Sequence, residues 1–133
     1  MAELEPDLLR DRRLLVVEDD YAIASDLEEA LEAHGAQVIG PAGTVADALE
    51  LIAAQGEIHG AVLDIDLHGE RAYPVADALR ARGVPFVFAT GYDAWIIPDA
   101  YAEVPRCEKP VDTRAVARML MRRRAKTDKH PVE

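Results

Sequence analysis

The sequence predicts a doubly wound α/β domain, in which a five-stranded parallel sheet has helices on both faces. Two observations support this fold class. Short apolar runs alternate with helical stripes along the chain, and such alternation favours parallel strands joined by right-handed crossovers. The length of 133 residues suits one domain. We expect an extension at 1–12, the domain itself at 13–124 and a polar tail at 125–133.

The first two strand and helix units have clear boundaries. The apolar run at 14–17 is followed by three acidic residues, which is typical of a strand buried on both faces. Apolar residues at every fourth position predict a helix over 21–34. A second short strand is expected at 36–40, and the pair Thr44 and Asp47 predicts a capping box at the start of a second helix.

The next two strands end directly at polar residues. Residues 59–63 predict a third buried strand, and 85–89 predict a fourth that is followed at once by Thr90 and a glycine. Pro74 suits the first turn of the helix between them, where its missing N–H is not needed. Two strand ends in this part of the chain are therefore candidates for chemistry.

The chain becomes less regular after residue 92. An apolar stretch within 93–103 starts like a helix, but Pro98 interrupts it, so we expect a short or mobile helix there. A brief fifth strand is expected at 104–107. Asp112 then caps a last helix, in which apolar residues recur at helical spacing.

The composition excludes several classes of protein. The net charge is −10, and an acidic surface repels phosphate backbones, so we expect no nucleic-acid partner. We interpret the basic run at 122–124 as the last turn of a helix. No apolar stretch approaches about 18 residues, which predicts no membrane insertion. The single cysteine, Cys107, cannot form an internal disulfide, and we expect a cytoplasmic protein.

Polar residues follow four of the five expected strands. Glu18 and Asp19 follow the first strand, Asp64 the third, Thr90 the fourth and Lys109 the fifth. The carboxyl ends of parallel strands meet at one edge of the sheet, which is where ligands bind. We therefore expect three carboxylates, a hydroxyl and an ammonium to converge at this edge.

Such a group of acids requires a counter-charge. Two like charges about 4 Å apart repel by roughly 4 kcal/mol at an effective dielectric near 20. Because the donors are oxygens without a Cys or His cluster, we expect Mg²⁺ rather than zinc. Asp64 stands alone at its strand end and is the expected nucleophile toward phosphorus, whereas Glu18 and Asp19 suit metal binding. Thr90 can donate its hydroxyl to a phosphoryl oxygen.

The motifs resemble those of the receiver family of two-component response regulators. They are Leu-Val-Val-Glu-Asp-Asp at the first strand, a lone aspartate after the third, Thr-Gly after the fourth and Lys-Pro after the fifth. The match spans residues 13 to about 124 and implies the flavodoxin-like receiver fold. It implies that Asp64 is the phosphoacceptor and that Thr90 and Lys109 bind the phosphoryl group.

The same resemblance implies a set of magnesium ligands. Asp19 and Asp64 are expected to bind the ion directly, and Glu18 through a water molecule. The backbone carbonyl of Asp66 completes the implied protein ligands.

One segment points to a narrower group of receivers. Residues 85–92, Pro-Phe-Val-Phe-Ala-Thr-Gly-Tyr, resemble the FATGUY subgroup of single-domain regulators, which work with HWE-type histidine kinases. This implies a regulator that takes a phosphoryl group from a histidine kinase or phosphotransfer protein and then binds an unknown downstream protein. We expect a phosphoprotein rather than a conventional enzyme, present as a monomer or a weak dimer.

The sequence departs from the family pattern at two places. Arg106 occupies the position of the usual switch aromatic, three residues before Lys109, so Tyr92 or Tyr101 is the candidate replacement. Leu67 and His68 replace the usual Met-Pro pair. We expect His68 to be an exposed and passive loop histidine.

Two other functions stay open at this point. The first is a degenerate receiver that acts as a phosphorylation-independent interaction module, which Arg106 and the missing Met-Pro pair favour. The second is a phosphatase, because Asp64 and Asp66 also match the Asp-x-Asp nucleophile motif of haloacid-dehalogenase-type enzymes. The chain is short for the cap domain of those enzymes.

Overall fold

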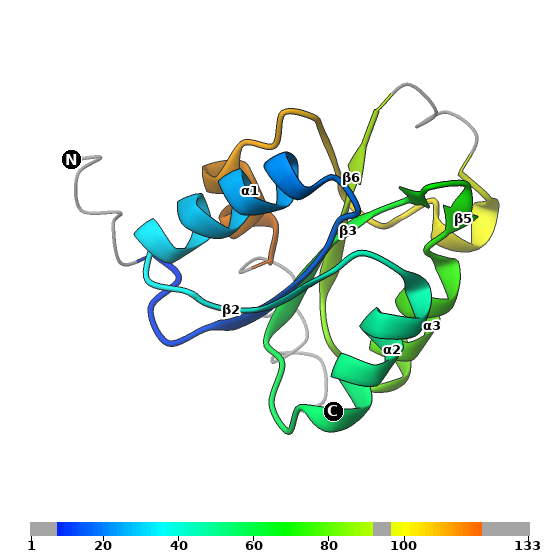
Figure 1. The fold of residues 1–133 in the computed structure, drawn as a ribbon, viewed down its shortest axis with the longest axis horizontal. Coiled ribbons are helices and arrows are strands. Elements are labelled where there is room, and N and C mark those ends of the chain that lie inside the picture. The colour runs from blue at the N-terminus through cyan, green and yellow to red at the C-terminus, as the bar shows by residue number, and fades with distance from the viewer. Residues whose placement is uncertain (1–7, 92–96, 121–133) are drawn as a thin grey trace, which may run out of the picture.

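The computed structural model describes residues 8–91 and 97–120. Its main sheet has five parallel strands in the order β2-β1-β3-β6-β7 (Figure 1). The strands are β1 (Arg13–Val17), β2 (Gln37–Ala42), β3 (Gly60–Asp64), β6 (Phe86–Thr90) and β7 (Arg106–Glu108). The helices are α1 (Tyr21–Ala33), α2 (Val45–Ala54), α3 (Tyr73–Ala81), the 3₁₀ helix η3 (Asp99–Tyr101) and a C-terminal helix that begins at Thr113 and is described to Leu120. The predicted fold class is confirmed.

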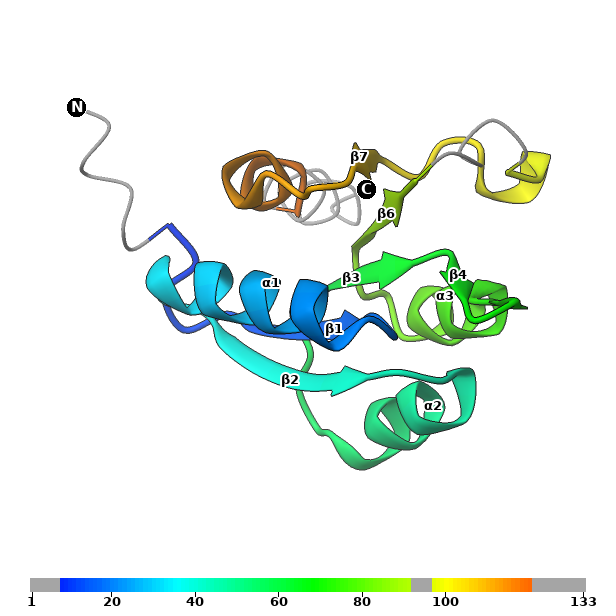
Figure 2. The ribbon, with the colours of Figure 1, turned by 45° about the horizontal axis from the view of Figure 1, so that its top comes forward.

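Helices cover both faces of the main sheet. Figures 1 and 2 show α1 and the C-terminal helix on one face and α2 and α3 on the other. Each face has its own apolar core: Leu14, Leu31 and Leu120 pack on one side, and Ile52 and Leu79 on the other. β3 and β6 are buried along their whole length, as expected for parallel strands between two helix layers.

The expected helix starts are present. Asp20 caps α1, because its Oδ1 accepts a hydrogen bond from the Ile23 backbone N–H at 3.1 Å. Thr44 caps α2 in the same way, through the Asp47 N–H at 3.0 Å. Asp112 accepts from the N–H of Arg114 at 3.0 Å at the start of the C-terminal helix. Each cap satisfies a donor that the helix itself leaves unpaired, and such a contact contributes about 1 kcal/mol.

The structure differs most from the sequence prediction in β2, in the last strand and directly after β3. β2 continues beyond residue 40 to Ala42, and the last strand covers 106–108 rather than 104–107. Directly after β3 the chain forms a hairpin that was not predicted, with strands β4 (Asp66–Leu67) and β5 (Glu70–Arg71). Its strands have only two residues each, too few for the alternating pattern by which strands are recognised.

The structure describes the chain from residue 8 at the N-terminal end and up to residue 120 at the C-terminal end. Leu9 is fully buried, and its N–H donates to the carbonyl of His34 at 2.8 Å, so the chain just before β1 is anchored to the domain through Leu9. The expected tail at 125–133 and the basic run at 122–124 lie outside the described residues, as does part of the helix expected within 93–103. No helix in the described ranges is long and apolar enough to cross a bilayer.

Candidate functional site

The strand register explains why the polar residues meet at one edge. Val17 of β1 is level with Leu63 of β3, so the residues that follow them, Glu18 and Asp64, lie side by side. Thr90 ends β6, the other neighbour of β3. Because adjacent strands are about 4.8 Å apart, residues far apart in sequence become neighbours here.

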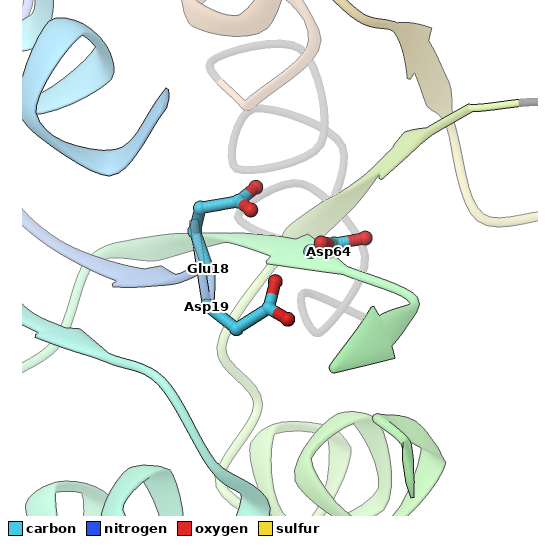
Figure 3. A group of neighbouring side chains, drawn as sticks. All are labelled: Glu18, Asp19 and Asp64. Carbon is cyan, nitrogen blue, oxygen red and sulfur yellow. The ribbon is translucent and has the colours of Figure 1, made fainter. Parts of the chain in front are cut away.

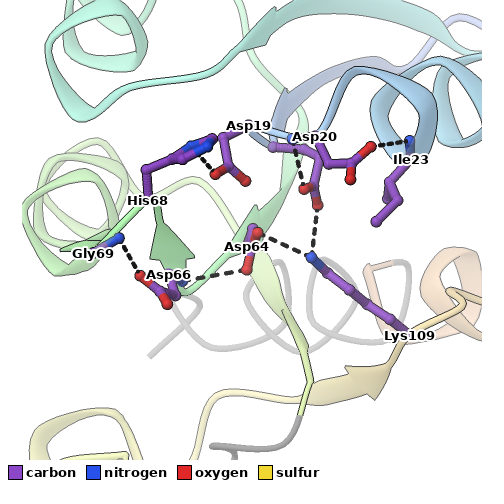
Figure 4. Close-up of polar contacts among 9 residues, drawn as sticks. Asp19, Asp20, Ile23, Asp64, Asp66, His68, Gly69 and Lys109 are labelled. Carbon is purple, nitrogen blue, oxygen red and sulfur yellow. Dashed lines mark hydrogen bonds and ion pairs between the residues drawn. The ribbon is translucent and has the colours of Figure 1, made fainter.

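The three predicted carboxylates form one cluster (Figure 3). Glu18, Asp19 and Asp64 each place an oxygen within 4.8 Å of the others. Glu18 and Asp64 are buried, with 5% and 7% of their surface exposed. Nζ of Lys109 donates to Oδ2 of Asp64 at 2.9 Å and lies 3.0 Å from Oε1 of Glu18 (Figure 4). One ammonium is thus shared by two acids.

The protonation of the cluster follows from burial. Burial raises the pKa of Glu18 to about 7, despite the hydrogen bond from Lys109. It also raises the pKa of Asp64. Burial by itself lowers the pKa of Lys109, but its hydrogen bonds with the two acids outweigh this effect and raise the pKa overall. The ammonium therefore remains charged, and the two buried acids bind their protons more tightly than they would in water.

Thr90 has a buried hydroxyl without a partner. Its side chain is 3% exposed. Within the described ranges, Oγ1 of Thr90 is the one buried side-chain polar atom without a hydrogen-bond partner. Such a group costs about 1–3 kcal/mol unless a ligand satisfies it. Thr90 and Lys109 line a pocket of about 330 Å³ together with Gly91 and Glu108. An anion bound beside Asp64 can supply the missing acceptor.

Asp66 follows the cluster on the hairpin rather than joining it. Its backbone N–H donates to Oδ1 of Asp64 at 3.2 Å and fixes the orientation of that carboxylate. Its own Oδ1 accepts the N–H of Gly69 at 2.8 Å across the hairpin turn. The Asp66 side chain is therefore used in the turn, and the predicted role of its backbone carbonyl in metal binding stays a prediction.

His68 contacts the acidic cluster, which the sequence did not predict. Its side chain is 81% exposed, as expected, but its Nδ1 forms an ion pair or hydrogen bond with Oδ2 of Asp19 (Figure 4). The signal that could have revealed this lies in the two turn residues His68 and Gly69 between Leu67 and Glu70. A short turn with Gly at its second position is typical of a two-residue hairpin, and that hairpin directs the imidazole back over the site.

The residues proposed for switching have different surroundings. Tyr92 lies outside the described residues. Arg106 is exposed at the start of β7, and its Nη2 donates to the carbonyl of Ala102 at 3.4 Å. Tyr101 stacks on Tyr73 with ring centroids 4.6 Å apart and meets Phe88 edge to face at 6.2 Å. Their roles in switching stay predictions.

Comparisons with known proteins give one curated relative and several solved structures. No family model matches the chain. Over 93 residues it is 38% identical to the phyllosphere-induced regulator PhyR of Methylorubrum extorquens, which corresponds to 68% of this chain and 34% of PhyR. The chain thus spans about a third of the length of that relative.

The solved structures cover most of the chain. The solution structure of SdrG from Sphingomonas melonis Fr1 is 38% identical, with a TM-score of 0.74, over 85% of this chain and 96% of SdrG. The BeF3-activated conformation of SdrG from Pseudomonas melonis Fr1 is 39% identical, with a TM-score of 0.68, over 82% and 92%. A response regulator receiver protein from Sinorhizobium medicae is 25% identical, with a TM-score of 0.70, over 86% and 98%.

Proposed function

Because this chain belongs to the receiver-domain family of response regulators, we propose that it accepts a phosphoryl group on Asp64 and signals by binding another protein. The observation that carries this proposal is the convergence of three carboxylates and Lys109 beside the unpaired hydroxyl of Thr90. This set provides a nucleophile, ligands for a cation and hydrogen-bond donors for an anion.

The oxygen donors of the cluster fit Mg²⁺. Three carboxylates lie within 4.8 Å of one another beside one ammonium, so the cluster carries excess negative charge once its acids are ionised, and hard oxygen ligands favour Mg²⁺. In this proposal Asp19 and Asp64 hold the ion directly, Glu18 through water, and Asp66 through its carbonyl. When bound, Mg²⁺ supplies positive charge against the equatorial oxygens of a transferring phosphoryl group.

Three side chains of this protein have separate roles in the proposed phosphoryl transfer. A carboxylate oxygen of Asp64 forms the new bond to phosphorus, while the phosphorus–nitrogen bond of a donor phosphohistidine breaks and its electron pair stays on the imidazole. Lys109, already 2.9 Å from Asp64, neutralises part of the charge. Thr90 donates its free hydroxyl to a phosphoryl oxygen of the product.

Incubation with acetyl phosphate and Mg²⁺ tests the proposal. Intact-mass measurement should show one added phosphoryl group that is lost in Asp64→Asn, in the presence of EDTA, and on treatment with hydroxylamine. Asp99→Asn, which changes an exposed aspartate outside the site, is the matched control and should behave as the wild type. An unmodified wild-type protein, or a modified Asp64→Asn variant, would contradict phosphorylation at this residue.

We further propose that the donor is a histidine kinase, with an HWE-type kinase as the first candidate, and that the exchange takes place in the cytoplasm. The similarity of residues 85–92 to the FATGUY segment supports this choice. A phosphorylated HWE-type kinase should transfer its phosphoryl group to this chain faster than a phosphorylated kinase of another type does. Equal rates for the two kinases would contradict the preference.

The exposed Arg106 favours a second candidate function, a phosphorylation-independent interaction module. A receiver without the usual aromatic at this position still has a folded surface to which a partner can bind. Copurification distinguishes the two functions: partners recovered equally with the wild type and with Asp64→Ala support the module, and partners that require Asp64 and acetyl phosphate support the switch.

A further inference from the structure

The hairpin after β3 fixes the position of His68. Strands β4 and β5 pair antiparallel, with Leu67 level with Glu70. The two turn residues between them, His68 and Gly69, both have positive φ, 53° and 87°. These are the backbone conformations of a tight two-residue hairpin turn. His68 is therefore held at a defined point and does not belong to a long loop.

The base of the hairpin is anchored in the core. Leu67 is 3% exposed and belongs to the apolar core beneath α2 and α3. Ala72 is fully buried, and its N–H donates to the carbonyl of Ile65 at 2.9 Å, which closes the hairpin onto the end of β3. Because β3 also carries Asp64, the hairpin tip and the acidic cluster are parts of one anchored unit.

The three acids of the cluster have different partners. Lys109 contacts Glu18 and Asp64 from one side. Asp19 contacts His68 instead, and Figure 4 shows the imidazole and the ammonium at opposite ends of the group. Only 15% of the Asp19 side chain is exposed. A second side chain, the His68 imidazole, therefore faces the cluster, and it contacts one carboxylate alone.

We infer that His68 is a positioning residue for the cation site: the imidazole N–H holds one oxygen of Asp19 and orients this carboxylate toward Glu18 and Asp64. The inference rests on the proposed magnesium function. An imidazole Nδ1–H that faces a carboxylate donates a hydrogen bond to it and so fixes its orientation. An oriented carboxylate also loses less freedom when the ion binds.

The expected size of the effect follows from other metal sites. Removing the hydrogen-bond partner of a metal ligand typically weakens metal binding by about 10- to 100-fold. The His68 side chain is 81% exposed, and water competes for its hydrogen bond. We therefore expect the lower end of this range, about tenfold.

Two substitutions separate the hydrogen bond from the backbone turn. His68→Gly removes the donor and tolerates the positive φ, so the turn is preserved. His68→Asn also tolerates this conformation, and its amide nitrogen is bonded to Cγ, as Nδ1 is in histidine. The asparagine side chain can thus donate to Asp19 from nearly the same place, and it serves as the conservative rescue.

Calorimetric titration of Mg²⁺ into the unphosphorylated full chain tests the inference, with all three proteins in the same buffer at the same pH. His68→Gly should weaken binding about tenfold, and His68→Asn should bind within about threefold of the wild type. Carbon-13 shifts of the aspartate carboxyl groups should report a change at Asp19 in the glycine variant. Equal metal-free melting temperatures of the three proteins serve as the control for folding.

The outcomes distinguish this inference from the function on which it rests. Wild-type affinity or tighter binding in His68→Gly would overturn the role of His68, and so would binding in His68→Asn as weak as in the glycine variant. In either case a wild type that binds Mg²⁺ and becomes phosphorylated would leave the proposed function intact. A wild type that binds no Mg²⁺ would overturn both.

Discussion

The acidic edge, formed by Glu18, Asp19, Asp64 and Lys109, contrasts with the aromatic cluster of Tyr73, Phe86, Phe88 and Tyr101. The acidic edge has three acids for one ammonium, and its neighbour Thr90 has a hydroxyl without a partner. The aromatic cluster is complete, because its rings contact one another, and the Tyr101 hydroxyl donates to Asp77 at 2.8 Å.

This contrast separates a region whose polar groups are incompletely paired from one whose side chains satisfy one another. At the acidic edge one ammonium faces three acids, and the Thr90 hydroxyl has no acceptor. The aromatic cluster instead gains its stability from apolar contact, with Arg80 4.9 Å above the Tyr101 ring. The two regions share strand β6, on which Phe88 and Thr90 point to the same side because they are two positions apart.

Removing Lys109 should have the largest effect. Lys109→Met leaves Glu18 and Asp64 without their ammonium, so we expect phosphorylation by acetyl phosphate to slow by about 100-fold. The metal-free protein should also lose about 2 kcal/mol of stability at neutral pH, less than for a fully buried pair because Lys109 is 21% exposed. Intact-mass kinetics and urea unfolding measure the two effects.

Arg114→Met is the control for that experiment, because Arg114 is exposed and lies outside the acidic edge. It should leave both quantities nearly unchanged. A Lys109→Met variant that is phosphorylated at the wild-type rate would show that the acidic edge does not depend on its ammonium.

The aromatic cluster should respond in stability rather than in phosphorylation. Tyr101→Ala removes the ring that stacks on Tyr73 and should cost about 2 kcal/mol. Tyr101→Phe removes only the hydrogen bond to Asp77, which should cost about 1 kcal/mol or less. Urea unfolding measures both, and the rate of phosphorylation should stay within about twofold, since neither change touches the donors of the phosphoryl site.

A large loss of phosphorylation in Tyr101→Phe would show that the aromatic cluster and the acidic edge are functionally coupled. It would also support Tyr101 as the substitute for the missing switch aromatic at Arg106. Comparing spectra with and without beryllofluoride, a phosphoryl mimic, shows whether the Tyr101 ring changes its surroundings on activation.

The pH dependence of stability should be specific to the acidic edge. Burial raises the pKa of Glu18 from 4.5 to about 7, so the folded protein binds a proton more tightly than the unfolded chain. The resulting stability is fully present below about pH 4.5 and is lost as the pH rises through about 7. The raised pKa of Asp64 acts in the same direction. The raised pKa of Lys109 affects stability only above its ordinary value of 10.5.

Glu18→Gln should remove much of this slope. Its gain in stability over the wild type at pH 8 should be on the order of 1–2 kcal/mol without metal, and it should vanish near pH 4. Thermal melts of both proteins between about pH 4 and pH 8 measure this difference in stability. Added Mg²⁺ should stabilise the wild type more at pH 8 than at pH 5. A variant with the same slope as the wild type would assign the pH dependence to other groups.

The smallest effect is expected at Arg106. Its side chain is exposed on β7, so Arg106→Ala should change the free energy of unfolding by about 0.5 kcal/mol or less. Phosphorylation should remain within about twofold of the wild type. A loss of partner binding in a phosphorylated Arg106→Ala protein, measured by copurification, would place this residue in the output surface.

The sequence by itself determined most of the fold and the composition of the acidic edge. Apolar runs in β1, β3 and β6 ended at acids or at Thr90, and in a parallel sheet the ends of neighbouring strands must meet. The helix caps at Asp20 and Thr44 were also readable, because a cap depends on residues only three positions apart. These features are local, or they follow from the topology alone.

The tertiary structure alone decided which groups contact one another at this edge. The β4–β5 hairpin was missed because its strands have two residues each, and with it was missed the contact between His68 and Asp19. The division of partners, with Lys109 on two acids and the imidazole on the third, depends on side chains that converge from separate elements. The same holds for Tyr101, whose neighbours Tyr73 and Phe88 come from α3 and β6. Such contacts depend on distances in three dimensions, which residue spacing along a chain does not encode.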